Sequence, residues 1–174
     1  KNYPAAINAY NEALRMRVSI KPESQDVAII LSDIADVETE SGDYLSAEKN
    51  YSHALQIWKK FKDKEGVAGE ISGLANLALE QKHWDKAEKL ARKSYKVSRK
   101  IGDLKFFAGN CILLAQAILN QGYPTKALRY ARRGVDIFTY LHHNALEEAN
   151  EILTKCILAI EAENKNKLRK NKKK

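Results

Sequence analysis

The chain has 174 residues, of which 44% are hydrophobic and 30% are charged, and its formal net charge is +8. This composition is too apolar for a disordered chain and too poor in proline and glycine for a flexible linker. No uninterrupted apolar run is long enough to span a membrane, and Cys111 and Cys156 make neither a disulfide framework nor a CxxC pair. We expect one domain or one stretch of a repeat array, with two buried, reduced thiols.

Helical periodicity runs along the chain, because apolar residues recur at spacings of three and four and never alternate with period two. Gly42 and Gly122 stand where helices must end, and Asp63 and Asp103 stand where the next ones must begin as N-caps. The sequence therefore predicts an all-α chain of about eight helices. In chain order they are Tyr3–Val18, Glu23–Ser41, Tyr44–Phe61, Lys64–Lys82, Trp84–Ile101, Leu104–Gln121, Thr125–Leu141 and Asn144–Asn164.

A step of 40 residues relates these helices to one another. The step is seen in the series Ala35, Ala75, Ala115; Ala47, Ala87, Ala127; and Ile57, Val97, Ile137. It divides the chain into two-helix repeats at 23–61, 63–101 and 103–141, preceded at 1–20 by the second helix of a truncated repeat. A two-helix unit cannot bury its apolar face alone, so we expect neighbouring repeats to stack.

The pattern inside each unit resembles the tetratricopeptide repeat (TPR), a helix–turn–helix module. The first complete unit carries the best match, at Leu31, Ile34, Ala35, Gly42, Tyr44, Ala47, Tyr51 and Ala54. The period is longer than the usual one of roughly 34 residues, and the closing proline is missing. This variety is similar to arrays in bacterial signal-transduction ATPases, transcriptional regulators and peptide-pheromone receptors, and in animal spindle-orientation adaptors. The resemblance implies a right-handed superhelical α-solenoid of antiparallel helix pairs.

The end of the chain departs from the repeat. The helix at 144–164 carries Thr154 and Lys155 where the preceding unit carries Leu114 and Ala115, and a polar outer face is typical of a terminal capping helix. Residues 165–174 hold 7 of the 30 basic residues, which leaves a net charge of only +1 on residues 1–164. We expect this basic segment to be a disordered tail.

No motif for catalysis is recognisable. The glycines do not form a phosphate-binding loop, no histidine pairs with a second metal ligand at helical spacing, and no nucleophile motif is present. We expect no enzyme, no cofactor and no metal site. By resemblance, the first helices of the repeats line a concave groove that binds a protein or peptide. The implied groove residues are Ser32, Asp36, Thr39, Ser72, Asn76, Leu79, Ile112, Gln116 and Leu119.

Charge is divided between the two kinds of helix. The segment Glu23–Ser41 has six acidic residues and no base, whereas Trp84–Ile101 has seven bases against two acids. A ligand in the groove is therefore expected to be neutral or basic near Glu23–Ser41. Two alternatives remain open, which are a scaffold or oligomerisation element for an upstream enzyme and a weak nucleic-acid contact through the basic convex face and tail. We expect a cytoplasmic protein with further domains upstream and no membrane partner.

Overall fold

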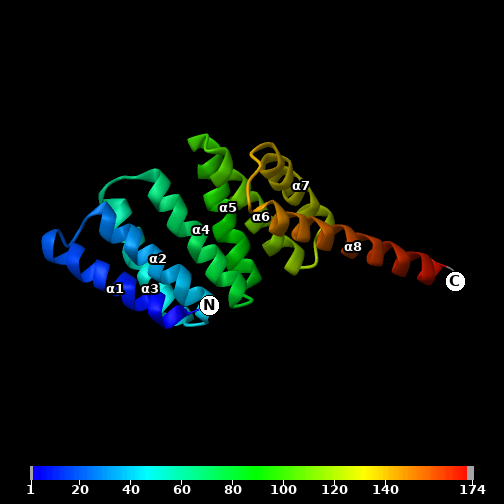
Figure 1. Cartoon of the computed structure of the whole chain (residues 1–174). Coiled ribbons are helices and arrows are strands. Elements are labelled where there is room, and N and C mark those ends of the chain that lie inside the picture. Colours follow the sequence, from blue (N-terminus) through cyan, green and yellow to red (C-terminus); the bar gives the residue numbers. More distant parts are fainter. Residues whose placement is uncertain (1, 172–174) are drawn as a thin grey trace. The chain divides into compact units, whose positions relative to one another are not determined.

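The computed structural model describes residues 2–171, which form eight α-helices and contain no strand. The expected all-α class is therefore confirmed. Figure 1 labels the helices in chain order. Their bounds are α1 Tyr3–Ile20, α2 Gln25–Ser41, α3 Tyr44–Lys60, α4 Lys64–Glu80, α5 Trp84–Ile101, α6 Leu104–Asn120, α7 Pro124–Tyr140 and α8 Leu146–Asn171. None of these helices has the length and apolar character needed to cross a lipid bilayer.

The chain divides into two compact units, Lys1–Val97 and Ser98–Lys174, which we call unit 1 and unit 2. In unit 1, α2 packs between α1 and α3, and α3 also packs against α4. The Ser94 hydroxyl of α5 donates to the carbonyl of Ala68 in α4, over 2.8 Å, so the first part of α5 covers α4. In unit 2, α7 packs against both α6 and α8.

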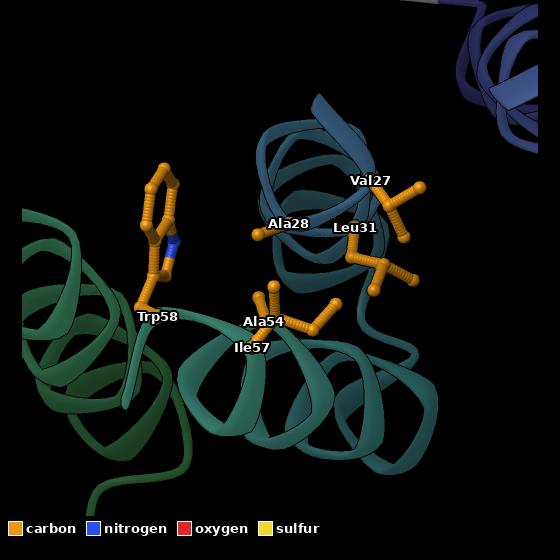
Figure 2. Close-up of a cluster of buried hydrophobic side chains, with 6 residues drawn as sticks. All are labelled: Val27, Ala28, Leu31, Ala54, Ile57 and Trp58. Atoms are coloured by element: carbon orange, nitrogen blue, oxygen red, sulfur yellow. The ribbon is translucent and has the colours of Figure 1, made fainter. Parts of the chain in front are cut away.

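The core of unit 1 lies between helices that are consecutive in sequence. Figure 2 shows one cluster, in which Ala28 and Leu31 of α2 turn toward Ala54 and Ile57 of α3. Ala28 and Ala54 are fully buried, so no larger side chain separates the two backbones. This contact explains why alanine recurs in the repeat pattern, since two helices can approach closely only where the side chains between them are small.

The turns repeat every 20 residues. Within two residues of the end of each helix from α2 to α7, one residue has a positive φ angle, namely Gly42, Lys62, Lys82, Gly102, Gly122 and His142. At five of these six turns the next residue donates its backbone N–H to a carbonyl five positions earlier, as His83 does to Ala78 over 2.8 Å. This is the Schellman arrangement, which satisfies the carbonyls left open at a helix end. The expected helix ends at Gly42 and Gly122 are confirmed.

Aspartates begin several helices as expected. The side chains of Asp63 and Asp103 accept hydrogen bonds from the backbone N–H of Gly66 and Phe106, both over 2.9 Å. Asp43 does the same for Ser46 over 3.2 Å. Each cap satisfies one of the amides that a helix start leaves open, and so fixes where α3, α4 and α6 begin.

The C-terminal end differs from the prediction. Helix α8 continues to Asn171, so residues 165–171 are helical rather than a disordered tail, while 172–174 lie outside the described residues. The segment contains no glycine or proline, and its lysines, arginine and leucine are good helix formers. Positive charge at the end of a helix is also favourable, and Arg169 and Lys170 occupy the last turn.

Both cysteines lie in unit 2 and are buried and free, as expected. Burial raises the pKa of the Cys111 thiol to about 12, although the positive charge of Arg133 opposes this shift. Burial likewise raises the pKa of Cys156. Both groups are therefore neutral thiols with low intrinsic reactivity.

Candidate functional site

The predicted groove residues of the first repeat lie on α2 in unit 1, and two of them are accessible. Ser32 is half-buried and Asp36 is exposed. They are one helical turn apart, so their side chains lie on the same face of α2. The rest of this helix is strongly acidic and contains neither lysine nor arginine.

Asp36 is tied to the neighbouring helix by Tyr51 of α3, whose hydroxyl donates a hydrogen bond to its carboxylate. Partial desolvation raises the pKa of Asp36, and the nearby charges of Asp33 and Glu40 raise it further, against the lowering effect of the Tyr51 hydrogen bond. The ring of Tyr51 is buried and lies where a Cβ atom on Gly73 would stand, so α4 approaches α3 closely at this point. Asp36 thus marks the place where α2, α3 and α4 come together.

Sequence reasoning missed Glu70, the most deeply buried charged side chain among the described residues. It projects from α4 with only 5% of its surface exposed. Its Oε1 accepts hydrogen bonds from the Ser32 hydroxyl of α2 and from the Trp58 indole N–H of α3, the latter over 3.1 Å. Its Oε2 is also buried and has no hydrogen-bond partner among the described residues.

The environment of Glu70 shifts its titration strongly. Burial raises the pKa of the carboxyl to about 7, and the charges of Asp36 and Asp33 add to the rise, whereas the Ser32 and Trp58 hydrogen bonds oppose it. The repeat contained a signal for this residue. One step of 40 before and after Glu70 stand Ile30 and Asn110, so a charge interrupts a column of neutral side chains.

On α4, Asn76 is exposed and Ser72 is half-buried one turn away, as expected for a binding face. In unit 2, Gln116 and Leu119 of α6 are half-buried. These four side chains are at least partly accessible on the first helices of their repeats.

Three predicted groove residues are instead buried, and their prediction as an accessible lining is wrong for this structure. Thr39 is 4% exposed because its hydroxyl turns back onto the Ala35 carbonyl, over 2.7 Å. Ile112 is 7% exposed because its side chain packs over Gly134 of α7. Leu79 is 4% exposed and belongs to the apolar core. The resemblance to the family implied these three positions, but here their side chains face the core.

No group of three or more metal-ligating side chains occurs among residues 2–171. A carboxyl with a pKa near neutrality is a feature of many active sites. In this chain, the carboxyl of Glu70 accepts hydrogen bonds from Ser32 and Trp58 in a junction of helices. The arrangement therefore offers hydrogen-bond acceptors and negative charge rather than a nucleophile beside a base.

Comparison with known proteins agrees with this architecture. Residues 26–100 match the family model of the tetratricopeptide repeat. No curated protein has a matching sequence. Solved structures do match, beginning with BtubC (BKLC) of P. vanneervenii, which is 21% identical with a TM-score of 0.69 over 86% of this chain and 63% of BtubC.

Two further structures resemble the chain at lower identity. The apo form of RapI is 17% identical, with a TM-score of 0.75 over 95% of this chain and 45% of RapI. A putative kinesin light chain of Podosopora anserina with nearly identical TPR-like repeats is 13% identical, with a TM-score of 0.72 over 94% of this chain and 81% of that one. The chain thus spans less than two thirds of BtubC and of RapI. The chain thus has the TPR-like fold, and its match to the tetratricopeptide repeat model covers residues 26–100.

Proposed function

We propose that this chain is a non-catalytic module that binds a protein or peptide along the first helices of its repeats, within a larger cytoplasmic signalling or regulatory protein. TPR repeats generally serve as interaction scaffolds, and the match at residues 26–100 supports that role here. The repeats that we propose are those at 23–61, 63–101 and 103–141. In unit 1, the first helices proposed to carry the ligand are α2 and α4.

The observation that carries this proposal is the polar, accessible face of α4. Asn76 is exposed and Ser72 half-buried one turn away, on a helix whose other faces are filled by core packing. An asparagine amide both donates and accepts, so it can bond the backbone of an extended peptide, which has the same two groups. On α2, Asp36 is likewise exposed, and Ser32 is half-buried one turn away.

The test is selection from a random peptide library displayed on phage, followed by titration of a selected synthetic peptide. We expect Asn76→Ala to weaken binding by about tenfold, which is the loss of one or two hydrogen bonds. The matched control is Lys89→Ala on α5, an exposed residue of a second helix, which should bind as the unaltered chain does. If the folded chain selects no peptide above the background of the bare support, the proposal fails.

A second candidate function is contact with a nucleic acid, and the charge of α5 is the observation that favours it. Lys89, Lys93 and Lys96 are exposed at spacings of three and four, so they form one basic stripe. Phosphate contacts need no more than such a stripe, but base stacking requires exposed aromatic rings, and α5 has none, since Trp84 and Tyr95 are half-buried. We therefore rank this function second.

A further inference from the structure

The carboxylate of Glu70 is held in a junction of three helices in unit 1. On α4, Glu70 lies between Gly66 and Gly73, and the rings of Trp58 and Tyr51 occupy the space that Cβ atoms on these glycines would fill. Glu70 is therefore flanked by two aromatic side chains of α3, and through Ser32 its carboxylate contacts α2. These contacts and the two hydrogen bonds to Oε1 hold the carboxylate in place.

One oxygen of this carboxylate is left without a donor. Oε1 accepts from Ser32 and Trp58, whereas Oε2 is buried and has no partner among the described residues. Buried carboxylate oxygens ordinarily accept hydrogen bonds from N–H or O–H groups, because removal from water is otherwise uncompensated. A further N–H or O–H donor at this position would satisfy it.

The charged groups that the structure places near Glu70, within residues 2–171, are acidic. Asp33 and Asp36 of α2 are close enough to raise the pKa of Glu70, and Asp33 also raises that of Asp36. Among the described residues, none of these three carboxylates forms an ion pair. We call Asp33, Asp36 and Glu70 the acidic cluster. It extends from the exposed Asp36 to the buried Glu70, with the half-buried Ser32 between them on α2.

We propose that the acidic cluster is the specificity element of the binding face, and that it takes a lysine or arginine side chain of the ligand whose N–H groups donate to Glu70 Oε2 and to Asp36. This inference rests on the proposed function, since it names the chemistry of the ligand at that site. A cation supplies the missing donor and the missing positive charge together. A metal ion is a poorer fit, because these side chains do not converge as a group of metal ligands.

The cluster distinguishes basic from neutral peptides through the state of Glu70. A cation bound next to the carboxylate favours its ionised form, so binding displaces the proton that the carboxyl retains near neutral pH. The charged groups facing it are Asp33 and Asp36 from α2, and the titratable hydroxyl of Tyr51 comes from α3. Affinity for a basic peptide therefore rises with pH through about 7 and levels off above about pH 8, where most of the carboxyl is ionised.

The experiment compares peptides that the folded full chain selects from a random phage-displayed library. We expect lysine or arginine at one fixed position, and we expect its replacement by norleucine or citrulline in the synthetic peptide to weaken binding at least about tenfold. Glu70→Gln and, separately, Asp36→Asn should weaken binding of the basic peptide by a similar factor. Glu80→Gln, which removes an exposed charge from the same helix, is the matched control and should not.

Calorimetry in two buffers of different ionisation enthalpy provides a second readout, since a purely structural role of Glu70 does not move it. Near pH 7 the unaltered chain should release a fraction of a proton on binding the basic peptide, and the Glu70→Gln chain should release none. Far-UV circular dichroism confirms that each variant is folded. Selected peptides without a fixed basic residue, or binding that is indifferent to both substitutions, overturn this inference and leave peptide binding standing. If no peptide is selected, the proposed function fails and this inference falls with it.

Discussion

At the scale of single residues, unit 1 buries an acidic side chain, Glu70, in a position that lowers the stability of the fold at high pH. Glu70 lies in a helix junction with two hydrogen bonds to one oxygen, none to the other, and two aspartates nearby. A carboxyl in such surroundings stays protonated to higher pH when the chain is folded than when it is unfolded. Folding is thus favoured at low pH and penalised at high pH by this one group.

Replacing Glu70 by glutamine should remove that penalty. The folded pKa is about 7 against an ordinary 4.5, so the favourable contribution is complete below about pH 4.5 and is lost as pH rises through about 7. We expect Glu70→Gln to raise the free energy of unfolding at pH 8 by up to about 3 kcal/mol, and the gain to shrink toward zero at acid pH. Urea unfolding at several pH values measures this, with Glu80→Gln as the control. A gain that does not change with pH would contradict the prediction.

A pair of glycines on α4 tests the junction sterically. A Cβ atom at Gly73 would overlap the Tyr51 ring, whereas one at Gly69 would meet no atom within 4 Å. Gly73→Ala should therefore cost about 1–3 kcal/mol through overpacking. Gly69→Ala should stabilise the chain by about 0.5–1 kcal/mol, because alanine favours a helix more than glycine does. Thermal unfolding of the two variants should give shifts of opposite sign, and shifts of the same sign would refute the packing described for Tyr51.

At the scale of elements, the six turns from α2 to α8 share a residue with a positive φ angle, but not the same residue type. Glycine occupies the positive-φ position at Gly42, Gly102 and Gly122, whereas lysine occupies it at Lys62 and Lys82. A side chain in this conformation is strained, since its Cβ crowds the backbone. The strain at the lysine turns is offset by the packing of the helices that they join.

Lys82→Gly should stabilise the chain by about 1 kcal/mol, because glycine adopts the observed φ of 60° without a steric penalty. Lys82 is exposed, so no packing is lost. Gly42→Ala is the reverse change at φ of 90° and should destabilise by about 1–2 kcal/mol. The measurement is chemical denaturation of both variants, and destabilisation by Lys82→Gly would show that the lysine side chain has a role in the turn.

Helices and turns were predictable because their signals are local. The predicted segments Lys64–Lys82 and Leu104–Gln121 agree with the observed helices α4 and α6 to within two residues, since Asp63 and Asp103 cap their starts. The Glu70 junction was not predictable in the same way, because it depends on Ser32 and Trp58 from two other helices. Burial of Ile112 was missed for a related reason, since its side chain packs over Gly134 of α7 and the distance between two helices cannot be read from the sequence.

At the scale of the whole molecule, the net charge of +8 arises from the end of the chain. Residues 1–164 carry only +1, while the seven bases of 165–174 are added in a short stretch that α8 extends into. Within the rest, bases concentrate on α5 and acids on α2. The excess positive charge therefore lies on other helices than the acidic cluster.

A chain truncated after residue 164 tests whether this charge binds nucleic acids. We expect the full chain to bind single-stranded DNA weakly at low ionic strength, with affinity falling steeply as salt is added, because binding releases counterions from the phosphates. Removing 165–174 should abolish most of that affinity and leave binding of a selected peptide unchanged. Fluorescence anisotropy at several salt concentrations provides the measurement. Tight binding that persists near physiological salt, or binding unaffected by truncation, would favour nucleic acid as the principal partner.

The placement of the two cysteines allows the opening of unit 2 to be measured by thiol labelling. Both are fully buried, both belong to unit 2, and unit 1 has none. A thiol reagent can modify them only when unit 2 opens, so the rate of labelling measures the opening equilibrium of residues 98–174 without any engineered probe. Labelling at increasing denaturant, set beside the loss of total helix signal, then shows whether the two halves of the chain open together or in turn.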